Sequence, residues 1–199
     1  MSEKLSIPEI IQNGIQIALK NFVALVVNAF LWVITIWIPY LNAGTTIALF
    51  TLPAKMGRDE GIEMTEIFKP GYRKYMGEYF LATALTIVGM YATVLFGGPI
   101  VLGIAWMFTG LLIVDKGYGP MDAIKKSNDL TYGYKMTIFL AMLVLYIGLF
   151  VVMAILSALG SIDYIGWIFY IVMFAVILGA GPIFLGMQAY VYKTLAADA

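Results

Sequence analysis

The chain contains no cysteine and no histidine among its 199 residues, and only 12% of its residues are charged. Without these two residue types it cannot build thiolate or imidazole metal sites, Ser-His-Asp or Cys-His nucleophiles, or thiol redox centres. It also lacks a Walker phosphate loop, a GxGxxG dinucleotide pattern and a cysteine for lipidation. Carboxylate clusters are the main chemistry left. We therefore expect no enzyme activity, no catalytic residue, no metal site, no cofactor and no nucleic-acid partner.

Apolar residues dominate the rest of the chain. They make up 62% of it, and the mean hydropathy of +0.91 lies far outside the range of soluble domains. The composition therefore predicts a single integral membrane domain over residues 1–199.

Long uncharged runs locate the membrane spans, because a helix needs about 20 mostly apolar residues to cross roughly 30 Å of hydrocarbon. Four runs without Asp, Glu, Lys or Arg meet this requirement: 21–54, 79–114, 136–162 and 164–192. The first two, 34 and 36 residues long, exceed one span, and glycine and proline interrupt them at residues 39–44 (PYLNAG) and 97–99 (GGP). We therefore predict an all-α, polytopic membrane helical bundle with six spans.

The basic residues predict the orientation of these spans, because Lys and Arg are retained on the cytoplasmic side. With six spans, one face carries the N-terminal segment, residues 55–78, residues 115–135 and the C-terminal segment, which hold two, five, four and one of the 12 basic residues. The opposite face has none. We therefore expect a multi-pass protein of a prokaryotic cytoplasmic (inner) membrane with both termini in the cytoplasm. The acidic residues Glu3 and Glu9 argue against a cleavable signal peptide.

Two amphipathic segments are predicted to lie at the cytoplasmic interface. In the first, Ser6 and Glu9 form a capping-box pattern before apolar residues at helical spacing, which is typical of a membrane-surface helix and, less often, of a helix that binds a partner. The second begins near Pro120, which suits a first helical turn. Its basic residues are the candidates for anionic lipid headgroups: Lys116, Lys125, Lys126 and Lys135.

An internal repeat is suggested at an offset of 56 residues. This offset aligns the charged stretch after residue 115 with an earlier one after residue 59, through four identities and one conservative match. Both stretches are expected to follow a hairpin and to contain a short polar helix. The chain is then divisible into three units of interfacial helix plus hairpin, at residues 1–54, 55–114 and 115–199.

Residues 114–135 also follow a recognisable pattern of a valine-aspartate step, a glycine, an alanine, a serine four residues later and a glycine six beyond it. The residues are Val114, Asp115, Gly117, Ala123, Ser127 and Gly133. In this pattern the chain resembles bacterial and archaeal membrane proteins related to the membrane domain of glycerophosphoryl diester phosphodiesterases, and several integral membrane families of unknown function. The ending AYVYKTL, at residues 189–195, is similar to that family's ending. The resemblance implies a six-span bundle with cytoplasmic connecting helices, and little about activity.

Other polar and kink-forming residues allow more than one interpretation. Asp59, Glu63 and Glu66 would share a helix face that could bind a hard cation, but five basic residues in the same loop favour mutual pairing. Small residues at helical spacing, including Gly186 and Ala189, indicate close helix packing. Pro182 could act as a hinge in the last span. The candidates for lining a water path are the polar residues of the second span: Asn42, Thr45, Thr46 and Thr51.

Three functions remain open at this point. The first is a non-enzymatic membrane module whose interfacial helices engage lipid headgroups or a partner protein. The second is an oligomeric passive pore or facilitator for ions or small solutes, lined by the second span. A third is a lipid-modifying enzyme that uses the acids of residues 59–66. The expected partners are membrane lipids, with a second copy of the chain or another protein as further candidates.

Overall fold

The computed structural model describes residues 5–197, and every regular element in that range is helical, which confirms the predicted all-α fold. The α-helices are α1 (Ile7–Lys20), α2 (Phe22–Thr35), α3 (Pro39–Gly57), α4 (Met76–Ala92), α5 (Gly98–Ala105), α6 (Thr109–Lys116), α7 (Pro120–Thr131), α8 (Lys135–Gly160) and α9 (Gly166–Leu195). The short 3-10 segments are η1 (Glu66–Phe68), η2 (Pro70–Tyr75) and η3 (Val94–Phe96).

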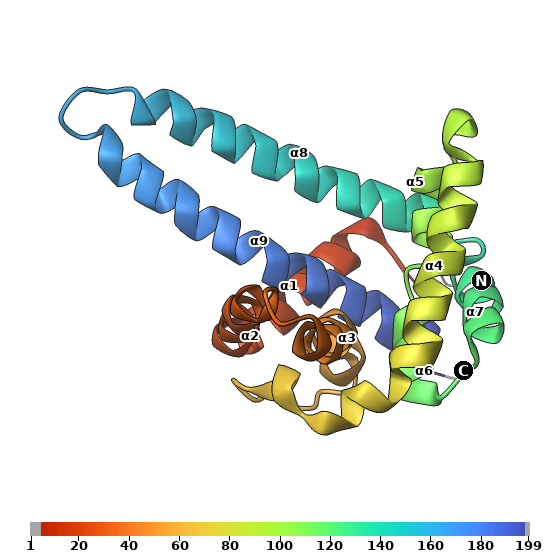
Figure 1. Cartoon of the computed structure of the whole chain (residues 1–199). Coiled ribbons are helices and arrows are strands. Elements are labelled where there is room, and N and C mark those ends of the chain that lie inside the picture. The colour runs from red at the N-terminus through yellow and green to blue at the C-terminus, as the bar shows by residue number, and fades with distance from the viewer. Residues whose placement is uncertain (1–4, 198–199) are drawn as a thin grey trace.

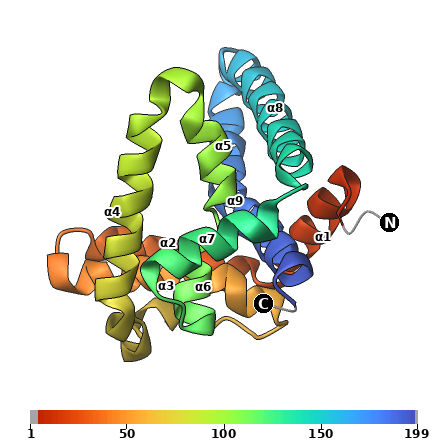
Figure 2. The same cartoon turned by 90° about the vertical axis from the view of Figure 1, so that its right-hand side faces the viewer.

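Three helical hairpins, α2/α3, α4/α5 and α8/α9, extend from a common base that contains α6, α7 and the last turns of α9 (Figure 1, Figure 2). They point in different directions. In Figure 1, α4 and α5 stand upright, α8 and α9 extend to the upper left, and α2 and α3 are seen nearly end-on. The hairpins therefore diverge instead of standing side by side as in the predicted bundle.

Three stretches are long and apolar enough to cross a membrane: Gly98–Lys116, which joins α5 and α6, and the helices α8 and α9. A fourth candidate is the pair α1 and α2, which are bent by 75° relative to each other. The chain thus carries candidate membrane spans, which confirms the membrane prediction in part. α2 and α4 have 14 and 17 residues, fewer than the about 20 that a span requires, so the six predicted spans are not reached by length and hydropathy.

The turns of the hairpins agree with two of the three predicted breaks. GGP forms the α4/α5 turn, where Gly97 has φ +70° and Pro99 lies in the first turn of α5. The α8/α9 turn follows Gly160, as expected. The prediction that PYLNAG forms a turn is wrong: α2 ends at Thr35, and Pro39 begins α3. The physical reason is that proline is well suited to a first helical turn, where its missing N–H has no partner to lose.

Helix α1 is amphipathic and has the predicted capping box, in which the Ser6 side chain accepts a hydrogen bond from Glu9 N and the Glu9 side chain accepts one from Ser6 N. Its buried face, however, packs on α9 within the protein. A Cβ added at Gly14 would lie 2.5 Å from Met187 Cγ, and one added at Gly186 would lie 2.2 Å from Gly14 O. The two glycines therefore permit backbone contact between α1 and α9.

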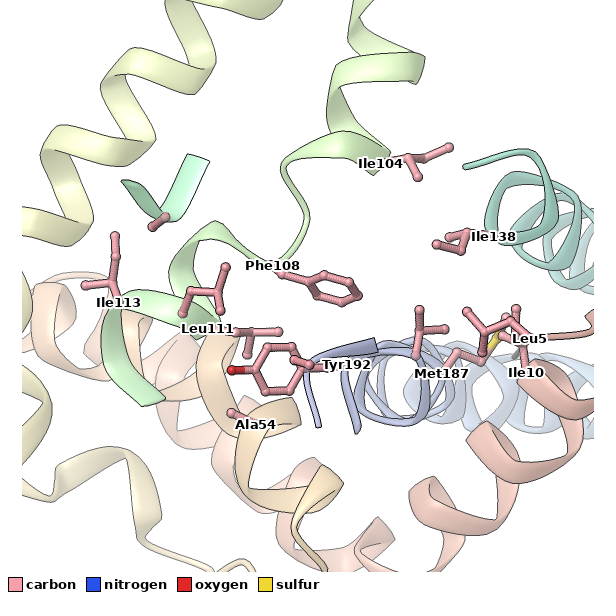
Figure 3. Packing of buried hydrophobic residues seen from close by; sticks show 14 of the residues in the cluster. Leu5, Ile10, Ala54, Ile104, Phe108, Leu111, Ile113, Ile138, Met187 and Tyr192 are labelled. Atoms are coloured by element: carbon pink, nitrogen blue, oxygen red, sulfur yellow. The ribbon is translucent and has the colours of Figure 1, made fainter. Parts of the chain in front are cut away.

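The apolar core lies at the base, where α1, α3, α6, α7 and α9 meet (Figure 3). Phe108 is fully buried there and packs edge-on against Tyr192, with ring centroids 5.4 Å apart. The far parts of α8 and α9 are different, since only 11% and 6% of their most apolar windows are buried. Large apolar side chains on these helices are exposed, which is a surface suited to hydrocarbon.

The loop between α3 and α4 does not contain the polar α-helix predicted for it. Its residues form turns followed by η1 and η2, and Asp59 has a left-handed φ of 59°. Gly61 and Pro70 interrupt an α-helical pattern here. The later stretch does contain the expected helix, α7, and its glycines Gly117 and Gly133 have φ values of +71° and +84°. The two aligned stretches therefore adopt different conformations.

Candidate functional site

An ion pair between an exposed arginine and a buried aspartate lies at the base, where the ends of three helices meet. Arg58, directly after α3, pairs with Asp115 in the last turn of α6, whose side chain is only 7% exposed. The Tyr192 hydroxyl of α9 donates to Asp115 Oδ2 at 2.8 Å. Arg58 also binds Glu60 through two nitrogens, Nε to Oε1 at 2.6 Å and Nη2 to Oε2 at 3.2 Å. The Glu60 hydrogen bond raises the pKa of Arg58, so the guanidinium keeps its charge.

A cleft of about 490 Å³ opens around this ion pair. Three cations and two carboxylates line it: Lys55, Arg58, Lys116, Glu60 and Asp115. A second hollow of about 270 Å³ lies on the α9 side and shares Arg58, Asp115 and Lys116 with the first. We call the two hollows together the charged cleft. The second hollow adds Lys193, so the lining of the charged cleft has two more basic than acidic side chains.

Glu66 holds one wall of the charged cleft in place. Its side chain is 1% exposed and accepts hydrogen bonds from Lys55 Nζ at 2.8 Å, Lys69 Nζ at 2.9 Å and the Tyr72 hydroxyl at 3.1 Å. Burial alone would raise the pKa of Glu66, but the two lysines outweigh it and the pKa lies below its ordinary value. Burial, together with Glu66, raises the pKa of the Tyr72 hydroxyl, which therefore stays protonated.

Three of the acids, Glu60, Glu63 and Glu66, are paired with basic residues of the segment 55–78, as the simpler interpretation of the sequence predicts, whereas Asp59 pairs with residues outside this segment. Glu63 accepts from Lys69 Nζ at 2.7 Å, and Asp59 from Lys193 Nζ at 2.6 Å. The shared helix face expected for the acids is absent, because the loop is not α-helical. Over residues 5–197, no three acidic side chains come close enough together to hold a metal ion.

Asn28 of α2 anchors the same loop, and sequence reasoning missed it. This fully buried side chain donates from Nδ2 to Glu63 O at 2.7 Å and accepts from Ile67 N at 3.0 Å. It satisfies two backbone groups of a loop that has no regular ladder of its own. The available signal was a lone amide in the apolar stretch that forms α2.

The residues behind the family resemblance have structural roles at the base. Ser127 Oγ accepts from Phe108 N at 3.1 Å and donates to Ala105 O at 2.8 Å, so it satisfies the backbone where α5 breaks from α6. Ala123 is fully buried, and Asp115 forms the ion pair described above. The pattern therefore has a folding explanation in this chain.

The four lysines predicted to bind headgroups lie on three different helices. Lys116 lies at the charged cleft, whereas Lys125 and Lys126 lie on α7 and Lys135 donates to Asn128 Oδ1 at 2.8 Å. Within residues 5–197, Lys116 has no ion-pair partner. Sequence reasoning included this lysine but missed Lys55 and Arg58, which the packing of α3 against α6 brings to the same cleft.

Three of the residues predicted to line a water path, Thr45, Thr46 and Thr51, are hydrogen-bonded within the α2/α3 hairpin, whereas the buried Asn42 Nδ2 has no partner within residues 5–197. Thr45 Oγ1 lies 2.9 Å from Thr35 Oγ1, and Thr46 Oγ1 accepts from Trp32 Nε1 at 2.9 Å and lies 3.4 Å from Asn42 Oδ1. Thr51 donates to Ile47 O at 2.7 Å and also lines the charged cleft. Pro182 is buried inside an uninterrupted α9. Water-path and hinge roles for these residues stay predictions.

Comparisons of this chain with protein-family models, curated proteins and solved structures find no match.

Proposed function

We propose that the chain is an integral protein of a prokaryotic cytoplasmic membrane, with its base in the cytoplasm and the α4/α5 and α8/α9 hairpins crossing the bilayer, and with α2/α3 as the candidate for a third crossing hairpin. Exposed aromatic side chains at the three hairpin turns support this, because Trp and Tyr favour the membrane interface. Trp37, Phe96 and Tyr164 are 87%, 90% and 97% exposed. Each hairpin that crosses contributes two spans, so the number of spans is even. Both termini therefore stay on the basic, cytoplasmic side whether four or six helices span the membrane.

The proposed role is non-enzymatic: the charged cleft binds the phosphate of an anionic lipid headgroup. The observation that carries this role is the position of Lys116, a lysine without an ion pair over residues 5–197, on a cleft that Lys55 and Arg58 also line. The Lys55 ammonium group has three N–H groups, and one of them donates to Glu66, so two are left for a ligand. Binding anchored at the base would let the protein sense or recruit particular lipids, and a partner protein could use the same surface.

Native mass spectrometry of the detergent-extracted protein tests this role, with phosphatidylglycerol and phosphatidylcholine added in parallel. We expect preferential retention of phosphatidylglycerol and a loss of about fivefold in its affinity for Lys116→Gln, because a lysine near an anionic headgroup contributes about 1 kcal/mol. Lys74→Gln is the matched control. It removes the same charge from an exposed side chain that does not line the cleft.

Equal retention of the two lipids would contradict headgroup selectivity. An equal loss in Lys74→Gln and Lys116→Gln would show that the attraction comes from net charge and not from the cleft. The native spectra also report the number of subunits, and a closed ring would favour the oligomeric pore or facilitator.

A further inference from the structure

A separate cavity, of about 210 Å³, lies beside the break between α5 and α6. It shares no lining residue with either hollow of the charged cleft. Its walls come from α3, α4, α6, α9 and the residues of the break. Gly98–Lys116 is a candidate span, and a non-helical backbone inside a span is tolerated where protein covers it or where it lines a polar cavity. At this break, Gln188 Nε2 of α9 donates to Met107 O at 2.9 Å.

The cavity has polar walls but no charged side chain. Thr83 Oγ1 donates to Tyr79 O at 2.8 Å, and Thr86 Oγ1 donates to Thr83 O at 2.9 Å. Each hydroxyl has thereby used its only hydrogen, so both can only accept further hydrogen bonds. A ligand at these two residues must therefore supply donors.

Thr109, in the first turn of α6, is the unusual member of the lining. It is 5% exposed, and its Oγ1 makes no hydrogen bond with any residue in the range 5–197. A buried hydroxyl without a partner is destabilising. The Oγ1 atom itself is buried, so a ligand in the cavity reaches it only after a rotation about χ1, which threonine in a helix permits because it occupies two χ1 rotamers.

Two aromatic rings that pack closely against glycines complete the walls of the cavity. A Cβ added at Gly110 would lie 2.7 Å from Tyr79 Cε2, and one added at Gly89 would lie 2.6 Å from Trp106 Cη2. Both rings line the cavity. Any larger residue at either glycine would push a ring out of place, so the shape of the cavity depends on both positions.

We propose that this cavity binds a small, uncharged solute that carries several hydroxyl groups. A charged ligand would lose its hydration without a counter-charge in the wall, whereas a neutral polyol has donors for Thr83 and Thr86 and can both donate to and accept from Thr109. The volume is well above the about 10–15 Å³ that a single water requires. This site is separate from headgroup binding at the charged cleft.

Fluorine NMR of the whole chain in lipid nanodiscs tests the proposal, with all four tryptophans replaced by 5-fluorotryptophan and Trp106→Phe used to assign the cavity signal. The solute is meso-erythritol. The control is 1,2-dimethoxyethane, which accepts hydrogen bonds but donates none. We expect erythritol alone to shift the Trp106 signal saturably. Thr109→Val should weaken that response at least fivefold, and Thr109→Ser should keep it.

A linear shift shared by all four tryptophan signals, or saturable binding that Thr109→Val leaves unchanged, would overturn the proposal. Thermal unfolding controls for misfolding, because the valine removes an unpaired hydroxyl and should keep or raise the Tm without solute. Thr86→Val supplies a second variant, and its erythritol affinity should also fall. Lys116→Gln should bind erythritol normally, so the solute and headgroup proposals fail separately.

Discussion

At the scale of single residues, the base depends on a few polar side chains buried among apolar ones. Glu66 joins Lys55, Lys69 and Tyr72, and Asn28 holds the backbone on either side of it. Removing one member of such a network leaves its partners without hydrogen bonds, which costs more than the hydrogen bond itself contributes. These residues are therefore expected to control the conformation of the α3–α4 loop.

Glu66→Gln should lower stability by about 2 kcal/mol at neutral pH, because two lysines lose their charged acceptor in a buried position. The measurement is the Tm in mild detergent. Glu78→Gln is the control, since Glu78 is exposed and forms no ion pair with residues 5–197, and its Tm should stay near that of the wild type.

The pH dependence of this difference has a definite sign. The pKa of Glu66 is lowered on folding from its ordinary value of 4.5, so its contribution is complete above pH 4.5 and is lost as pH falls through the lower, folded pKa. The Tm gap between wild type and Glu66→Gln should therefore close in acid. A gap that is the same at pH 7 and well below pH 4 would show that Glu66 does not act through its charge.

At the scale of elements, the break between α5 and α6 is maintained by a helix that lies across it. Ser127 and Thr131 of α7 both reach Ala105 O, at 2.8 and 3.4 Å, and Ser127 also accepts from Phe108 N. A continuous helix through residues 98–116 would make these bonds unnecessary. The position of α7 thus fixes the break, and with it the cavity beside Thr109.

Ser127→Ala should destabilise the protein by about 1–3 kcal/mol, because the Phe108 amide loses its acceptor in a buried position. Hydrogen exchange by mass spectrometry is the measurement. Peptides that contain residues 105–109 should exchange faster, while those from α8 stay unchanged. Ser157→Ala, on the exposed surface of α8, is the matched control. Unchanged protection around Phe108 would contradict the role of Ser127.

At the scale of the whole molecule, the α4/α5 and α8/α9 hairpins extend away from the base (Figure 2). Large apolar side chains are exposed on these hairpins, and the charged cleft lies at the base. Hydrocarbon is the solvent in which the exposed apolar surface of α8 and α9 is stable, and water is the solvent for the charged cleft. The molecule should therefore sit with its base at one membrane surface. The α2/α3 hairpin, with its exposed Trp37, decides between four and six spans.

Single cysteines test this topology directly, since the natural chain has none. In intact cells, a membrane-impermeant maleimide should label Leu95→Cys and Ser161→Cys at two hairpin turns. Met121→Cys and Tyr132→Cys at the base should react only after lysis. External labelling of Trp37→Cys is expected for six spans. Labelling of Trp37→Cys only after lysis would reduce the number to four, and external labelling of the base would reverse the orientation.

Much of the local structure could be predicted from the sequence. Composition and uncharged runs predict the helical, membrane-type character, and Ser6 with Glu9 predicts the start of α1. The GGP turn and the pairing of the loop charges follow from properties of neighbouring residues. The PYLNAG turn and the polar helix after residue 59 were predicted wrongly, because proline can either start a helix or end one.

The sequence by itself determined the hydrophobic balance, the helices and most turns, since these depend on residues within a few positions of one another. Only the tertiary structure decided that α1 crosses α9 through two glycines, that the hairpins diverge, and that Arg58 meets Asp115 and Tyr192. It also placed Ser127 at the α5–α6 break and left the Thr109 hydroxyl without a partner in residues 5–197. Contacts between residues far apart in the chain depend on how whole helices pack, and no local pattern encodes that packing.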